Sequence, residues 1–184
     1  MTFQNIDTET EELNLVNAAR KDPRVFGVLY ERYVNQVFRY LYSRTGNQQD
    51  AEDITAQTFL AAFESFERYR GNGYFGAWLF GIAKNKVNDH YRQSKSLVEI
   101  EGTAEVPDNH DLLSDAISAD QSTTLQKLIQ QLPEDEQELL RLRFLAELSY
   151  SKIALLLHRN EDAVKKSIYR LLARLQSQVE DHNE

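Results

Sequence analysis

The chain has 184 residues, a formal net charge of −8, 41% hydrophobic and 27% charged residues, and no cysteine. This composition is typical of a soluble folded chain with one large domain or two small ones, and the lack of cysteine excludes disulfides and thiolate metal sites. No apolar run approaches the ~20 residues that cross a bilayer, and the polar, acidic first residues predict no secretory signal peptide. With only seven glycines and three prolines, we expect a cytoplasmic, largely helical protein.

Charge is distributed unevenly along the chain. Residues 1–19 hold four acidic and no basic residues, and residues 20–95 hold twelve basic and eight acidic. Residues 96–119 hold six acidic and no basic residues, and residues 120–184 hold nine basic and eleven acidic. The net charges are therefore −4, +4, −6 and −2. Because a polyanion responds to local charge, the basic block can contact nucleic acid although the whole chain is acidic.

These changes in composition divide the chain into an acidic N-terminal tail (1–21), a first helical domain (22–95), an acidic linker (96–119) and a second helical domain (120–184). The predicted fold class is therefore all-α, with two small domains. The linker contains Gly102 and Pro107, lacks a sustained helical period and carries only negative charge, so we expect it to be extended and flexible. It is either a tether or a segment that mimics nucleic-acid charge or follows a basic channel on a partner.

Three amphipathic helices are predicted in the first domain. Apolar residues at steps of three and four place the first from about 22–23 to just before 46–47, the second from about 50, and the third over 74–92. The inward stripe of the second helix consists of Ala51, Ile54, Thr58, Phe59, Ala62, Phe63 and Phe66. At 100° per residue, Asp53, Gln57, Leu60 and Glu64 lie on the opposite face. This face is either ordinary solvated surface or a docking surface for a basic, partly apolar protein.

The third predicted helix and the loop before it combine basic, amide and aromatic residues. The loop contains Tyr69, Arg70 and Asn72, and the outer positions of the helix include Lys84, Asn85 and Asn88. Cations neutralise phosphates, aromatic rings stack on unpaired bases, and amides bond to base edges, so the set suits single-stranded nucleic acid. Alternatively, the aromatic side chains simply close the core of the domain.

The second domain ends in a predicted helix-turn-helix. A brief helix containing Ile153 precedes a turn, Asn160 is a good N-cap, and the last helix has a buried stripe spaced four, three and four. Its outward residues include Lys165, Lys166, Tyr169 and Arg170, and residues 159–174 carry five bases and two acids, a local +3. A basic outer helix in this motif enters the major groove of DNA.

Three segments in the same order resemble the extracytoplasmic-function (ECF) type of sigma factor, the small promoter-specificity subunits of bacterial RNA polymerase. They are DAEDITAQTFLAAF (50–63), FGAWLFGIAKN (75–85), and LSYSKIA (148–154) with VKK (164–166). The resemblance covers roughly residues 22–95 and 120–178, so it implies a sigma region 2 domain at 22–95 and a region 4 helix-turn-helix domain at 120–184. The tail and the linker carry no part of it.

The resemblance implies roles for three sets of residues. The second helix would dock on the clamp coiled coil of the polymerase core, through Asp53, Gln57, Leu60 and Glu64. The loop and third helix would open the −10 promoter element and capture a flipped base, through Tyr69, Arg70, Asn72, Lys84, Asn85 and Asn88. The last helix and the one preceding the motif would bind the −35 element, through Arg143, Lys165, Lys166, Tyr169, Arg170 and Arg174. The family also implies an anti-sigma partner, which no residue here identifies.

Four positions depart from the family pattern. His158 and Glu147 stand where glycine is frequent, and a left-handed backbone at His158 would cost energy. Ser167 and Leu172 stand where basic residues are common, which leaves the promoter sequence open. The residues show no catalytic constellation and no metal or cofactor site, so we expect a binding protein. Two alternatives are a stand-alone helix-turn-helix regulator and a relative that only binds an anti-sigma factor.

Overall fold

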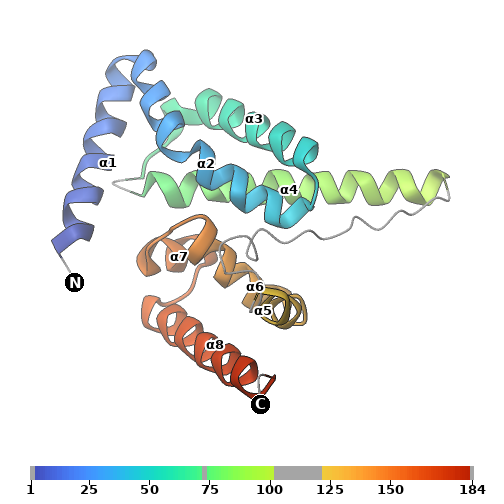
Figure 1. The fold of residues 1–184 in the computed structure, drawn as a ribbon. Helices are drawn as coiled ribbons and strands as arrows, with labels where there is room; N and C mark the ends of the chain where they lie inside the picture. Colours follow the sequence, from blue (N-terminus) through green and yellow to red (C-terminus); the bar gives the residue numbers. More distant parts are fainter. Residues whose placement is uncertain (1–2, 72–73, 102–121, 183–184) are drawn as a thin grey trace.

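The structure is a computed structural model that describes residues 3–71, 74–101 and 122–182. Every regular element in these ranges is helical, which confirms the predicted all-α class. The helices form two layers (Figure 1): α1 (Phe3–Lys21), α2 (Phe26–Thr45), α3 (Gln48–Ser65) and α4 (Phe75–Glu101) make the first, and α5 (Ser122–Gln130), α6 (Glu134–Leu140), α7 (Tyr150–Leu157) and α8 (Glu161–His182) make the second. No helix within the described ranges combines the length and apolarity needed to cross a bilayer.

The three helices predicted in the first layer begin close to their expected positions, and local capping fixes two of these starts. Asp22 caps the 3₁₀ turn Pro23–Val25, and its carboxylate accepts a hydrogen bond from the Arg24 amide at 3.0 Å. The Arg24 side chain holds the pKa of the Asp22 carboxyl below its ordinary value. Gly46 ends α2 at a φ of 64°, where glycine is strain-free. The Asn47 side chain then caps α3, which therefore begins at Gln48, two residues before the predicted start.

Two segments differ from their expected form. Residues 3–21, interpreted as part of an acidic tail, form helix α1, whose Val16 and Ala19 are buried in the main core. Helix α4 continues to Glu101, so residues 96–101, which were assigned to the linker, are helical. The rest of the predicted linker lies outside the described residues.

The second layer contains the predicted helix-turn-helix. The Ser149 hydroxyl caps α7 by accepting from the Lys152 amide, and the Asn160 side chain caps α8 by accepting from the amides of Asp162 and Ala163. A π-helical segment, Arg141–Leu145, joins α6 to the turn before α7. The predicted inward stripe of α8 is buried in full: Val164, Ile168, Leu171 and Leu175. His158 ends α7 at a φ of 52°, and Glu147 has a φ of 56°, so both take the left-handed conformation.

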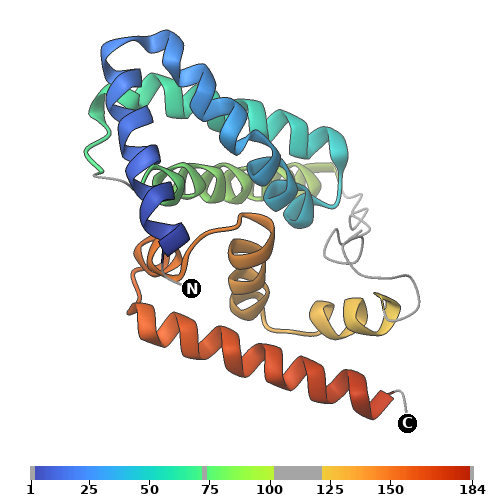
Figure 2. The same ribbon diagram turned by 60° about the vertical axis from the view of Figure 1, so that its left-hand side comes forward.

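The two layers share one hydrophobic core. Leu29, Tyr40 and Phe80 of the first layer belong to the same buried cluster as Leu142 and Ile153 of the second. Figure 2 shows α7 and α6 between the first layer and α8. Gly76 and Gly81 of α4 lie against the second layer, because a Cβ atom added at Gly76 would lie 3.4 Å from Leu148 and one at Gly81 would lie 3.5 Å from Leu156, both ordinary van der Waals distances. A smaller cluster beneath α5 contains Leu128, Ile129, Leu132, Leu140, Leu171 and Leu175.

Candidate nucleic-acid interface

The outer face of α8 presents cations to solvent. Burial of the stripe that includes Val164 and Ile168 turns the opposite side of the helix outward, and Lys165, Lys166 and Arg170 are exposed there. Tyr169 lies among them with 55% of its surface exposed. The ion pairs found among the described residues do not involve these three cations, so they remain available to phosphates.

The other two arginines predicted at this surface have different surroundings. The Arg174 guanidinium pairs with the Glu136 carboxylate of α6, on the flank of α8. The Arg143 guanidinium donates to the Leu148 carbonyl oxygen at 3.0 Å and lies 4.9 Å from the centre of the Tyr150 ring. Arg143 therefore supports the turn before α7 in this arrangement.

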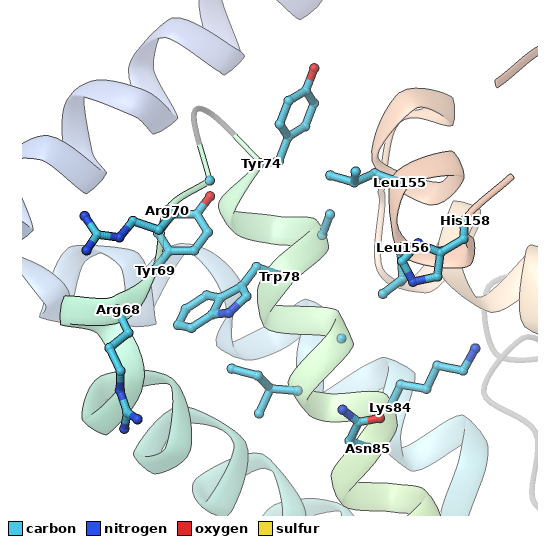
Figure 3. A pocket seen from close by; sticks show the side chains of 14 residues that line it. Arg68, Tyr69, Arg70, Tyr74, Trp78, Lys84, Asn85, Leu155, Leu156 and His158 are labelled. Carbon is cyan, nitrogen blue, oxygen red and sulfur yellow. The ribbon is translucent and has the colours of Figure 1, made fainter. Parts of the chain in front are cut away.

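A hollow of about 790 Å³ lies between α4 and α7 (Figure 3). It brings together four of the six residues predicted for the −10 surface: Tyr69, Arg70, Lys84 and Asn85. Figure 3 shows Tyr74 projecting from the start of α4, and Leu155, Leu156 and His158 of the α7 side lying across the space from α4. The hollow therefore has one wall from each layer, and sequence reasoning did not find the α7 wall because it depends on packing between distant segments.

Tyr69 is a core residue in this structure. Its side chain is only 5% exposed, and its ring lies 4.6 Å from that of Trp78, measured between centroids. Burial, then the negative charge of Glu12, raises the pKa of Tyr69 to about 12. A Cβ atom at Gly71 would lie 2.3 Å from the Tyr69 hydroxyl oxygen, so the loop needs glycine where it crosses this ring. The exposed aromatic side chain on this side is instead Tyr74, which the sequence showed only as part of the loop.

Of the other two predicted −10 residues, the structure describes only Asn88, and Lys84 in the hollow lies near a carboxylate. The Asn88 amide oxygen accepts from the Arg44 guanidinium at 3.2 Å, and Asn88 borders a separate shallow depression. The Lys84 ammonium lies 3.9 Å from a carboxylate oxygen of Glu138. Asn72 lies outside the described residues.

The predicted docking face of α3 is exposed throughout. Asp53, Gln57 and Glu64 are exposed, and Leu60 has 59% of its surface open to solvent. The expectation that Phe63 points inward is wrong, because 49% of its surface is exposed. An edge contact ties it to the core: the centroids of the Phe63 and Phe26 rings lie 5.2 Å apart. The short Ala62 and the large Phe66 fill the core at this end of α3, so Phe63 lies at its rim beside Leu60 and enlarges the apolar part of the face.

Two buried carboxylates connect the layers. The Glu12 carboxylate, 1% exposed, accepts from the Tyr33 hydroxyl, from the Phe75 amide at 3.0 Å, and from the Lys152 ammonium at 2.8 Å. Burial and then the charge of Glu12 raise the pKa of Tyr33 far above its ordinary value. Because Lys152 belongs to α7, this contact joins α1, α2, α4 and α7.

The second carboxylate belongs to Glu138 of α6. It accepts from the Tyr40 hydroxyl at 2.9 Å and from the Arg44 guanidinium at 3.0 Å, and it lies near Lys84. Burial and then the charge of Glu138 raise the pKa of Tyr40 well above its ordinary value. A third, exposed pair joins Arg39 to Glu147 at 2.6 Å.

Comparison with known proteins gives two matching family models in chain order. Sigma-70 region 2 matches residues 29–96, and Sigma-70 region 4 matches residues 122–175. These two ranges correspond to the helices from α2 to α4 and from α5 to α8, which carry the three surfaces described above.

Curated relatives extend this likeness. The chain is 35% identical over 155 residues to the ECF RNA polymerase sigma factor BldN of Streptomyces coelicolor, which covers 82% of this chain and 58% of BldN. It therefore spans a little over half the length of that relative. It is 27% identical over 171 residues to the ECF RNA polymerase sigma factor SigW of Bacillus subtilis, which covers 87% of this chain and 91% of SigW.

Solved structures share the fold. CnrH, in complex with the cytosolic domain of CnrY, matches with a TM-score of 0.65 at 22% identity, over 92% of this chain and 97% of CnrH. The sigma factor RpoE, in complex with the anti-sigma factor NepR from Bartonella quintana, matches with a TM-score of 0.62 at 20% identity, over 84% of this chain and 96% of that chain. The two family models and the two curated relatives show that the chain belongs to the sigma-70 family, as a sigma factor of the ECF type.

Proposed function

We propose that this chain is an alternative sigma factor that binds the bacterial RNA polymerase core and directs initiation at its own set of promoters. In this proposal, residues 22–95 form the region 2 domain, residues 120–184 form the region 4 domain, and residues 96–119 connect them. The chain supplies specificity and has no reaction of its own. Its place of action is the cytoplasm, where the bacterial polymerase transcribes DNA.

The outer face of α8 is the observation that carries the DNA-binding part of this proposal. Lys165, Lys166 and Arg170 are exposed on the second helix of a helix-turn-helix, with Tyr169 between them. Such a helix lies in the major groove, where cations contact phosphates and base edges. We assign this face to the −35 element, with Arg143 and Arg174 in supporting positions because each is held by a partner within the second layer.

The hollow between α4 and α7 is the candidate site for the −10 element. Arg70, Lys84 and Asn85 supply cations and an amide, and Tyr74 and Trp78 supply ring surface. Base stacking on aromatic rings contributes about 1–3 kcal/mol per base, which offsets the few kcal/mol needed to extrude one base from a duplex. In this role the buried ring of Tyr69 packs against Trp78 and supports it, and does not contact a base itself.

The α3 face is the candidate docking surface for the polymerase core. Its acidic Asp53 and Glu64 flank the exposed Leu60 and Phe63, a combination that suits a basic and partly apolar helix pair. An anti-sigma factor is the proposed negative regulator, by analogy with the complexes of the two structural neighbours.

Run-off transcription with core polymerase on a promoter library tests the proposed function. The wild-type chain should direct initiation at a defined subset of promoters, whereas core polymerase alone should not. The K165Q/R170Q variant should lose most of this activity, and K127Q, which removes an exposed lysine from α5, should retain it. Absence of specific initiation by the wild type, or equal activity of the two variants, would contradict the proposal.

Co-purification tests the docking face separately. The L60A/F63A variant should no longer be retained by immobilised core polymerase, because it removes the exposed apolar centre of α3 while its buried stripe stays intact. The matched control is V28A, which shortens another exposed apolar side chain, on α2. Equal retention of both variants would move the docking site away from α3.

A further inference from the structure

Arg159 lies in the turn between α7 and α8, and its backbone is held on both sides. His158 takes the left-handed conformation that ends α7, and the Arg159 amide donates to the Ala154 carbonyl oxygen at 2.9 Å, as in a Schellman motif. The next residue, Asn160, caps α8 with its side chain. The point from which the Arg159 side chain leaves the turn is therefore fixed.

The Arg159 side chain lies along α8. Its guanidinium donates to the Ser167 hydroxyl oxygen at 3.0 Å, although the two residues are 8 positions apart in the chain. Ala163 lies one helical turn before Ser167 on the same side of α8, and its small, exposed side chain leaves space for a long neighbour. The guanidinium thus stands beside the body of α8, beyond the turn that holds its backbone.

This contact adds a cation to one flank of the exposed α8 face. At 100° per residue, Lys165 and Tyr169 lie on one flank of that face, and Ser167 and Arg170 lie on the other. Because the Arg159 guanidinium is bonded to Ser167, it joins Arg170 on the second flank. Figure 2 shows α8 along the outer edge of the second layer, away from the first layer. Both flanks therefore present cations on the side that a duplex can approach.

Cations on both flanks suit a helix that lies in a major groove. The groove is about 12 Å wide, and a helix with its side chains fills it, so the phosphate backbones of the two strands run along the sides of the helix. Base edges lie in front of the helix, where Lys166 is central on the exposed face. A guanidinium beside the helix, such as that of Arg159, is placed for a phosphate.

The Arg159 guanidinium keeps its charge available to an anion. The ion pairs found among the described residues do not include Arg159. The nearest acids in the chain, Glu161 and Asp162, are exposed in the first turn of α8 and form no ion pair with it. The Ser167 hydroxyl is uncharged and occupies only one of the five N–H donors of the guanidinium, so it orients the group without neutralising it.

We propose that Arg159 is a further DNA-contacting residue of the −35 surface, which binds a phosphate beside α8, and that Ser167 is its positioning residue. The inference deepens the proposed function and rests on it for the assignment of α8 to the −35 element. Ser167 restricts the arginine before DNA arrives, so less rotamer freedom is lost on binding. Ser167 stands where basic residues are common in the family, and in this chain the cation reaches that place from the turn.

Fluorescence anisotropy with the full-length chain and a labelled promoter duplex, at several salt concentrations, tests both roles. The R159Q variant should weaken binding about 10-fold and lower the slope of log affinity against log salt by about 1, because one phosphate contact is lost. The S167A variant should weaken binding about threefold with an unchanged slope, because the cation stays but must be ordered on binding. The S167T variant keeps the hydroxyl and should restore the wild-type affinity.

A double-mutant cycle separates positioning from an independent effect of Ser167. The R159Q/S167A variant should bind like R159Q, because Ser167 acts through Arg159. The matched controls are S177A, which removes an exposed hydroxyl farther along α8, and K127Q, which removes an exposed lysine from α5. Both controls should keep the wild-type affinity and slope. Circular dichroism checks that each variant keeps its helicity.

An unchanged salt slope in R159Q, or additive effects of R159Q and S167A, would overturn the inference. A phosphate contact carries no sequence information, so R159Q should weaken binding equally on the promoter duplex and on an unrelated duplex; a loss confined to the promoter duplex would also contradict it. The proposed function fails by a different result, namely no specific run-off transcription by the wild type. That result leaves the duplex measurements to decide the role of Arg159.

Discussion

The outer face of α8 and the hollow beside α4 carry the same kinds of side chain but differ in their accessibility. On α8, Lys165, Lys166 and Arg170 are exposed and belong to none of the ion pairs found among the described residues, whereas Arg174 on the flank pairs with Glu136. Beside α4, Lys84 lies near a carboxylate, Tyr69 is buried, and α7 forms the opposite wall. The difference shows that basic and aromatic residues in the sequence can indicate a nucleic-acid surface. They do not indicate whether its side chains are exposed or are already in contact with the rest of the protein.

Alkaline pH should have the largest effect on the stability of the fold, and it should act on the α4 side of this comparison. Tyr33, Tyr40 and Tyr69 are buried there with raised pKa values, and that of Tyr69 is about 12. The unfolded chain ionises its tyrosines near pH 10, so the stability from these groups is complete below about pH 10 and is lost as the pH rises toward 12 and above. Absorbance at 295 nm, followed together with circular dichroism, should show a late tyrosine ionisation that coincides with unfolding. A late ionisation with intact helicity would contradict the burial of these rings.

The K165Q/R170Q variant tests the α8 side. Loss of two phosphate contacts should weaken binding to a promoter duplex by about 10–100-fold, and should lower the slope of log affinity against log salt by about 2. Fluorescence anisotropy at several salt concentrations measures both. The K127Q control should preserve the slope, and an unchanged slope in the double variant would move the duplex contacts away from α8.

Gly71 tests whether the loop is closed over Tyr69. The G71A variant places a methyl group within 2.3 Å of the Tyr69 hydroxyl, and overpacking of this kind costs about 1–3 kcal/mol in the free energy of unfolding. The control is G27A on α2, where an added Cβ meets no atom within 4 Å and should instead stabilise the helix by about 0.5–1 kcal/mol. Urea denaturation compares the two. Equal stability of G71A and wild type would mean that Tyr69 can leave the core, and would restore it as a DNA-contacting residue.

The smallest expected effect concerns the start of α8. In the N160A variant, the amides of Asp162 and Ala163 lose their side-chain acceptor, which should cost about 1 kcal/mol of stability. Thermal unfolding measures this change. The hollow beside α4 should be unaffected, so fluorescence of Trp78, the single tryptophan, serves as the internal control; a shift in its emission at low temperature would show that the two regions are coupled.

Patterns within one helix were enough to predict most helices from the sequence. Which side chains are buried between distant segments could not be predicted in this way. The stripe of Val164, Ile168, Leu171 and Leu175 and the Asn160 cap depend on neighbours within one helix, so the sequence displays them. Helix α1 was interpreted as part of a tail because residues 1–19 carry four acids and no base. The burial of Glu12, one of these acids, depends on Tyr33, Phe75 and Lys152, which are far away in the chain. Tyr69 was assigned to a surface because an aromatic residue beside arginines has the same local signature in a core as in a binding loop.

The left-handed residues at the two ends of the α7 segment carry a strain that glycine would avoid. Each left-handed conformation costs about 1–2 kcal/mol for a residue with a Cβ atom, and here Glu147 and His158 adopt it. The Glu147 carboxylate pairs with Arg39 of the first layer, and His158 lines the hollow. Glycine at either site would therefore relieve the strain, and at position 147 it would also remove the contact with Arg39.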